Sequence, residues 1–172
     1  MYKKVNQLIG LSLLIFGTIQ LSAQNTNEKV KESILKVEFC DNSNICSVED
    51  VSLLQEVIGK LPSPKTNPEF EGGVEALRKY FAINSLTDEK AKDLFFRVTI
   101  AFVVNCEGKA GNFQIISRGK GDLETFANQV LEIVNNMPQN WIPAQRKGKA
   151  VDCYQVLSFS IKEGKLDNVS YK

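Results

Sequence analysis

Hydrophobic and polar residues follow two different periods along the C-terminal two thirds of the chain, which predicts a mixed α+β fold. Over Leu94–Val104, apolar residues occupy every second position, as is typical of a strand that packs one face on a core. The turn at Asn105–Gly108 and the return segment Ala110–Ser117 then predict a β-hairpin. Val151–Ile161 repeats the alternation and predicts a third strand.

Helical periodicity appears on both sides of this hairpin. Gly73–Phe81 and Asp122–Asn136 carry apolar residues three and four positions apart, which predicts two amphipathic helices. Nearer the N-terminus, Ser47–Leu61 shows the same spacing behind a serine that can cap a helix. A shorter pattern over Glu28–Phe39 predicts one further helix.

The first residues of the chain resemble a signal peptide. Lys3 and Lys4 precede an apolar run over Leu8–Ile19, and Ala23 ends a small-residue cleavage signal. The run is shorter than the roughly 20 apolar residues that span a bilayer, so we expect cleavage and a periplasmic protein whose mature form does not span the membrane. A retained anchor, secretion and association with the outer membrane remain open. The expected organisation is a signal peptide over residues 1–23, a partly helical N-terminal extension and linker over 24–66, a folded domain over 67–165 and a polar tail over 166–172.

Composition argues against several classes of function. The chain has 21 basic and 20 acidic side chains, so it lacks the positive charge expected of a nucleic-acid-binding protein. It contains no histidine, which removes Ser-His and Cys-His catalytic pairs and the commonest metal ligand. None of its cysteine spacings is Cys-x-x-Cys. We therefore expect no enzyme activity, no catalytic residues, no metal site and no cofactor.

Four cysteines in an exported chain predict disulfides. Cys40 and Cys46 flank a polar loop, and a bond between them would close a small ring. Cys106 and Cys153 lie far apart in the sequence, and their pairing depends on the topology of the sheet.

Three segments together carry a resemblance to a known family. Asn67–Tyr80 contains the pattern Pro-Glu-Phe-x-Gly-Gly-x-x-Ala-Leu-x-x-Tyr, the hairpin turns at Gly108-Lys109, and Trp141–Val151 contains Trp-x-Pro followed by Gly-Lys-x-Val. In this order, over residues 67 to 165, the segments resemble the C-terminal domain of TonB in the form typical of Bacteroidota envelope proteins. The resemblance implies an α+β domain with the order α-β-β-α-β and helices packed on a three-stranded antiparallel sheet.

The sheet order can also be argued from connectivity. The hairpin strands are antiparallel, and the following helix returns the chain so that the third strand can pair antiparallel with the first. The expected order is second–first–third, with the third strand at an edge. The end of the first strand then meets the start of the third, which brings Cys106 within disulfide reach of Cys153.

The resemblance also implies a function. TonB domains bind outer-membrane TonB-dependent transporters by adding a strand to an exposed edge, and an unpaired strand edge can accept an extended peptide. Because the chain lacks a long proline-rich spacer, we expect an adaptor or accessory factor for outer-membrane transport that does not itself transduce energy. The partner would be such a transporter or another envelope protein. The expected binding edge comprises Asp152, Tyr154, Gln155, Val156, Leu157 and Ser158.

Other interpretations stay open at this stage. The N-terminal extension or the tail could cover the third strand, because sheet edges are usually protected. Edge strands can also pair with a second copy, so a homodimer is compatible with the sequence. A cell-envelope structural or peptidoglycan-binding module is the alternative function, with the basic cluster Arg146–Lys149 as its contact.

Overall fold

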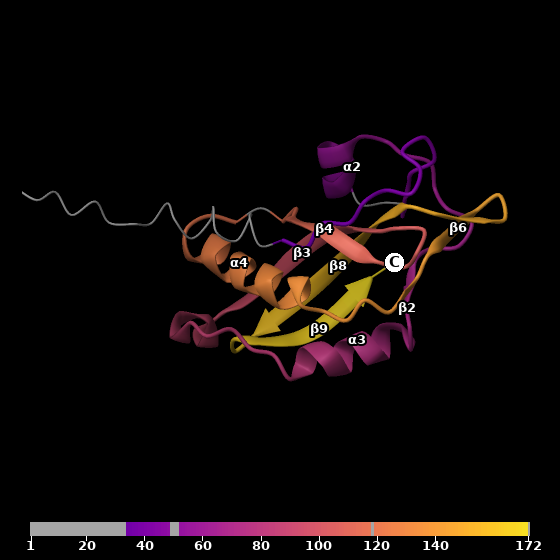
Figure 1. Cartoon of the computed structure of the whole chain (residues 1–172). Coiled ribbons are helices and arrows are strands. Elements are labelled where there is room, and N and C mark those ends of the chain that lie inside the picture. The colour runs from indigo at the N-terminus through magenta and orange to yellow at the C-terminus, as the bar shows by residue number, and fades with distance from the viewer. Residues whose placement is uncertain (1–33, 49–51, 118, 172) are drawn as a thin grey trace, which may run out of the picture.

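A computed structural model describes residues 34–48, 52–117 and 119–171. The predicted signal peptide lies outside these residues. No helix within the described ranges combines the length and the apolar character that a membrane crossing requires. The described chain forms an α+β domain in which helices pack against a mixed sheet (Figure 1).

The sheet is built around the three predicted strands. They are β3 (Phe95–Val104), β4 (Ala110–Ile115) and β8 (Cys153–Lys162), and they lie in the order β4-β3-β8 with antiparallel neighbours. The predicted second–first–third order of these strands is therefore confirmed. Two further strands, β1 (Cys46–Ser47) and β9 (Lys165–Tyr171), pair with β8 on the side away from β3. The prediction of a three-stranded antiparallel sheet is therefore wrong, because the described sheet has five strands and β1 runs parallel to β8.

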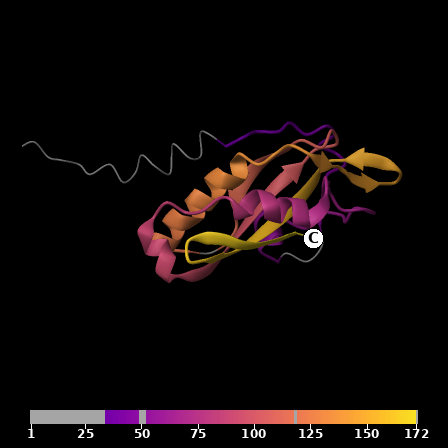
Figure 2. The same cartoon turned by 90° about the horizontal axis from the view of Figure 1, so that it is seen from below.

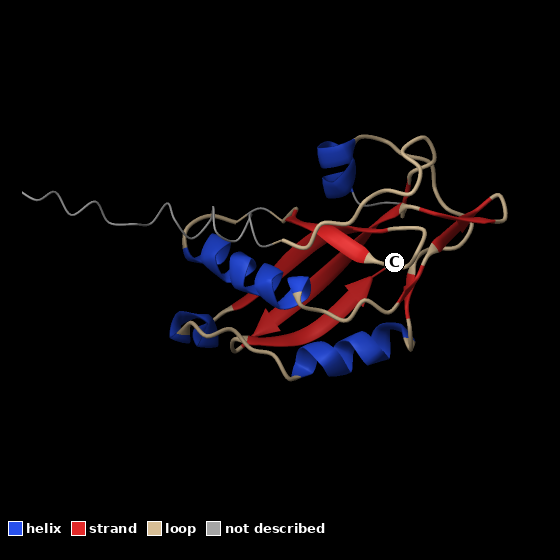
Figure 3. Cartoon of the chain, in the orientation of Figure 1, coloured by secondary structure: helices blue, strands red, loops and turns tan. Residues whose placement is uncertain are grey.

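Helices cover both faces of this sheet (Figures 1 and 3). The predicted helices α3 (Gly73–Ala82) and α4 (Asp122–Asn135) bury apolar side chains in the main core, and a short 3₁₀ helix, η1 (Glu89–Asp93), leads into β3. The helix α2 (Ser52–Ile58) falls inside the predicted Ser47–Leu61 helix, but Ser47 itself belongs to β1.

Aromatic rings fill the main core between the sheet and the helices α3 and α4. Phe81, Phe102, Phe126 and Phe159 are fully buried there. Trp141 is also buried, as expected from its size, and its ring contacts Phe70, Phe102 and Tyr171.

The connection between α4 and β8 contains short strands. β5 (Trp141–Ile142) pairs with β2 (Glu69–Phe70), and β6 (Ala144–Arg146) forms a hairpin with β7 (Lys149–Val151) that projects from the domain (Figure 2). The two turn residues of this hairpin, Lys147 and Gly148, have φ of 52° and 75°. Positive φ at both positions is typical of a tight type I′ turn.

The prediction of a helix over Glu28–Phe39 is wrong for its described part, residues 34–39, which run extended beside β4. The contact depends on a bulge in β4, where Asn112 has a φ of 56°. The backbone N–H of Asn112 donates to the carbonyl of Leu35 (2.8 Å), and its side chain bonds both backbone groups of Val37. Gly111 lets the segment approach, since a Cβ there would lie 2.8 Å from the Leu35 oxygen.

The predicted polar tail is also wrong, because residues 165–171 form β9. Glu163 and Gly164, with φ of 53° and 74°, make the tight turn that folds β9 back on β8. Leu166 and Val169 bury their side chains in the main core, and this burial holds the strand in place.

The second face of the sheet is covered by α2, so residues 34–66 belong to the domain rather than forming a separate extension. Leu54 of α2 is 1% exposed and packs with Ala101, Ile116 and Val156, whose side chains lie on the face opposite the main core.

Replacing Leu54 with alanine should therefore lower the free energy of unfolding by about 2–4 kcal/mol, since it leaves a cavity between α2 and the sheet. Val57→Ala is the matched control, because Val57 lies on the same helix and is 47% exposed; its effect should stay within about 0.5 kcal/mol. Urea denaturation of the full chain measures both. Equal stability of the two variants would mean that α2 is not part of the cooperative unit.

Candidate peptide-binding groove

The third strand is not a free edge, which corrects the prediction for β8. On the side away from β3, Cys153 and Tyr154 are paired with β1, and the residues from Leu157 to Lys162 are paired with β9. The N–H of Val48 also donates to the carbonyl of Tyr154 at 3.1 Å. The structure therefore has the alternative arrangement, in which the N-terminal extension and the tail cover this edge.

The predicted binding residues are accordingly spread over the interior of the domain. Leu157 lies in the main core, while Val156 and Tyr154 face α2. The side-chain amide of Gln155 is fully buried and donates to the carbonyl of Pro68 at 3.2 Å. Ser158 pairs with Ser170 of β9, so no surface suited to a partner is formed by this set.

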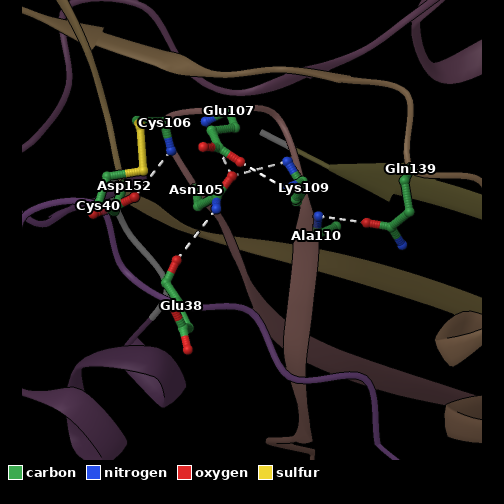
Figure 4. A network of polar contacts seen from close by, with 9 residues as sticks. All are labelled: Glu38, Cys40, Asn105, Cys106, Glu107, Lys109, Ala110, Gln139 and Asp152. Carbon is green, nitrogen blue, oxygen red and sulfur yellow. Dashed lines mark hydrogen bonds and ion pairs between the residues drawn. A yellow bond between two sulfur atoms is a disulfide. The ribbon is translucent and has the colours of Figure 1, made fainter.

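The disulfide pairing also differs from the predictions. Cys40 is bonded to Cys106 (Figure 4). Cys46 and Cys153 are buried thiols. Both predicted pairs, Cys40–Cys46 and Cys106–Cys153, are therefore wrong. The physical reason is that the segment beside β4 places Cys40 next to the turn after β3, with its Cα 6.1 Å from that of Cys106.

Polar side chains tie this end of the domain together (Figure 4). The carboxylate of Asp152, which is 1% exposed, accepts hydrogen bonds from the backbone N–H groups of Asp41 and Cys106, both at 2.9 Å. Asn105 accepts from Glu107 and Lys109 across the hairpin turn and donates to the carbonyl of Glu38 at 3.2 Å. The segment before β1 is thus fixed to the hairpin by a covalent bond and by partly buried hydrogen bonds.

Metal binding has little support here. Within the described ranges, one group of side chains has ligand atoms close enough to share an ion, and it consists of Cys40, Cys106 and Asp152. Its two sulfurs are bonded to each other and so do not offer thiolates.

At the opposite end of β3, part of the sheet edge has no partner strand among the described residues. Counted backward along β3 from the hairpin turn, Thr99 is the final described residue that bonds to β4 or to the residues just after it. Its carbonyl accepts hydrogen bonds from the N–H groups of Ile116 (2.9 Å) and Ser117 (3.3 Å). Among the described residues, Phe95–Val98 are paired with β8 alone, and we call them the open stretch of β3. Backbone groups alternate in direction along a strand, so those of Phe95 and Arg97 point to the same side as those of Thr99, away from β8.

A hollow of about 290 Å³ adjoins the open stretch of β3, and we call it the groove. It is bounded by β3, the end of β4 and α4, which runs along this side of the sheet (Figure 1). The apolar lining comes from Phe96, Val98, Ile115, Leu123 and Ala127, and the polar lining includes Arg97, Ser117 and Glu124.

Two exposed hydrophobic side chains lie beside the groove or on the open stretch of β3. Leu123 of α4 is 40% exposed, and Phe95 at the start of β3 is 65% exposed. Phe95 lies on the face of the sheet opposite Phe96, so apolar surface is present on both sides of the open stretch. An extended peptide paired with β3 would place alternate side chains in the groove and over Phe95.

No pattern in the sequence predicts this groove directly. The position of the groove depends on where β4 ends relative to the start of β3. The hairpin pattern over Leu94–Ser117 predicts each of these boundaries only to within a few residues. The exposed Phe95 was visible only as one apolar residue on the mixed face of the strand.

Comparison with known proteins identifies no relative. A scan of protein-family models, a search of curated proteins and a search of solved structures each returned no match. The interpretation of this chain therefore depends on its own residues.

The Cys40–Cys106 disulfide should contribute about 4 kcal/mol to stability, because it closes a loop with a sequence separation of 66. The double substitution Cys40→Ser and Cys106→Ser should lower the free energy of unfolding by that amount in urea denaturation without a reductant. Peptide mapping of the non-reduced wild-type chain is the accompanying check. A linkage of Cys40 to Cys46, or of Cys106 to Cys153, would contradict the pairing described here.

Proposed function

We propose that this chain is an exported, TonB-like protein-binding domain that acts as an adaptor or accessory factor in outer-membrane TonB-dependent transport. It binds an extended segment of its partner by strand addition at the open stretch of β3. The observation that carries this proposal is the combination of unpaired β3 backbone with an adjacent apolar groove. A sheet edge supplies binding energy through its backbone groups, and pockets for alternate side chains supply specificity.

The placement of the family-like segments supports the TonB-like part of the proposal. The first and third segments meet in space, because β2 pairs with β5 and Phe70 packs edge-on against Trp141 at 5.5 Å between ring centroids. The first segment continues into α3, which packs on the sheet through Leu77 and Phe81. Motif residues that are distant in sequence therefore build one continuous unit around the hairpin.

The binding edge in this proposal is β3 rather than β8. Strand addition at β8 would first require β1 and β9 to separate from it. The buried side chains of Leu166 and Val169 on β9 would then become exposed. Binding at the open stretch of β3 displaces no described strand. The cost of opening the domain is avoided, which favours β3 as the site.

The occupant is an extended peptide from a partner protein, such as the N-terminal segment of an outer-membrane transporter. A helix could fill an apolar groove but would leave the backbone groups of Phe95 and Arg97 without partners, whereas an extended chain satisfies both. The competing occupant is this chain's own residues before Ile34. Residues 35–40 run beside β4 from Asn112 toward the Cys106 turn.

Site-specific photocrosslinking from Leu123 in cells that express the full chain tests this proposal. We expect capture of extended segments of outer-membrane proteins, because Leu123 borders the groove. Ile83 is the matched control, since it is also a large hydrophobic residue at the end of a helix, is 84% exposed and lies outside the groove. The same photoreactive group at Ile83 should capture at least fivefold less.

Three results would contradict the proposal. They are capture of this chain's own residues before Ile34, capture of a second copy, and equal capture from Leu123 and Ile83. Recovery of peptidoglycan fragments in place of protein would favour the wall-binding alternative. The substitutions Leu123→Glu and Ile83→Glu give an independent readout through a photoreactive group placed at Phe95. Leu123→Glu should weaken capture from that group, whereas Ile83→Glu should not.

A further inference from the structure

The two cysteines outside the disulfide lie next to each other in the sheet. Cys46 of β1 and Cys153 of β8 are direct register partners in a parallel ladder, and both are 0% exposed. Directly paired residues point to the same face, and neighbouring strands lie about 4.8 Å apart. This spacing falls within the Cα separation of about 4.4–6.8 Å that disulfides span.

The side chains of this pair are in contact. The Cys46 and Cys153 thiols share a hydrogen bond, which lowers the pKa of Cys46, whereas that bond and burial raise the pKa of Cys153. Val48, Ala144 and Val151 complete a small buried cluster around the two sulfurs. The cluster that contains the two cysteines is separate from the main core.

We propose that Cys46 and Cys153 form a second disulfide, which fixes β1 to β8. Apart from the pairing of its two residues with β8, β1 is held by backbone bonds from Cys46 to Asp152 (2.9 Å), from Ser47 to Pro62 (3.1 Å) and from the adjoining Val48 to Tyr154 (3.1 Å). A covalent bond at Cys46 makes the short pairing of β1 with β8 permanent. The inference is independent of the groove, because it concerns the opposite side of β8.

The bond forms by thiol–disulfide exchange with a disulfide-containing oxidant, either a small molecule such as glutathione disulfide or a protein. The Cys46 thiolate attacks one sulfur of the oxidant and expels the other as a thiolate. Cys153 then loses its proton and attacks the Cys46 sulfur, which expels the second thiolate. Two cysteine thiols become one disulfide, and the oxidant gains the two electrons and two protons as two thiols.

Burial determines when this exchange takes place. An oxidant cannot reach sulfurs that are fully buried, so the reaction occurs during folding, before β1 docks, or during excursions in which β1 separates from β8. Once formed, the bond keeps Cys153 and Tyr154 of β8 covered. The extension then remains part of the sheet under conditions that would otherwise release it.

Peptide mapping of the full chain, refolded in a mixture of reduced and oxidised glutathione, tests the proposal. After denaturation and alkylation, we expect Cys46 linked to Cys153 in most molecules and no reactive thiol. Persistence of two reactive thiols at Cys46 and Cys153 would overturn the proposal, as would attachment of either residue to glutathione alone. A bond from either residue to Cys40 or Cys106 would overturn it too.

The double variant Cys40→Ser and Cys106→Ser isolates the second bond, because only Cys46 and Cys153 can then be oxidised. In this variant, the Val48 amide should exchange with solvent at least tenfold more slowly in the oxidised form than in the reduced form, since Val48 donates to Tyr154 beside the bond. Equal exchange in the two forms would show that the bond does not fix β1. If the variant does not fold, mapping of the wild-type chain still decides the pairing.

Discussion

The antiparallel pairing of β3 with β8 determines where every other part of this domain can lie. It is continuous from Phe95 opposite Lys162 to Val104 opposite Cys153, so it gives the sheet two distinct ends. At the Val104 end, the hairpin turn meets the segment before β1, and the Cys40–Cys106 disulfide and partly buried hydrogen bonds to Asp152 join them. At the Phe95 end, β4 has already stopped and β3 continues with β8 as its only described neighbour. One end of the sheet is therefore closed, and the other retains exposed backbone.

Protection of sheet edges explains the role of residues 34–66. An uncovered strand invites association with other chains, and natural proteins cover or interrupt such edges. Here Leu35 and Val37 cover β4 at its bulge, while β1 and β9 together cover β8. The open stretch of β3 differs from these protected edges, and it adjoins apolar surface from Leu123. This contrast is the reason for proposing that another protein binds at the open stretch of β3.

The sequence allowed the central elements to be predicted because their signals are local. Alternation over Leu94–Val104 and helical spacing over Gly73–Phe81 and Asp122–Asn136 each correspond to an element of the structure. The last strand β9 was missed although Glu163-Gly164 is a suitable hairpin turn, because Asp167 and Asn168 interrupt the apolar pattern after Leu166.

Features that depend on distant segments could not be predicted in this way. β1 is too short to show a period, and its position in the sheet comes from a parallel pairing with a strand more than half the chain away. The disulfide prediction correctly placed the end of β3 beside the start of β8. It failed because a third segment, carrying Cys40, occupies the space next to Cys106. The groove likewise depends on the relative lengths of β3 and β4, which no single window of sequence defines.

Residue-resolved amide hydrogen exchange on the free chain tests the central claim of an open edge most directly. The account predicts that the amides of Phe95 and Arg97 exchange at least a hundredfold faster than those of Val98 and Ile100, whose backbone groups point toward β8. Addition of a bound partner peptide should then slow the exchange of Arg97 selectively. Slow exchange of Arg97 in the free chain, equal to that of Val98, would show that the edge is already occupied and would contradict the account.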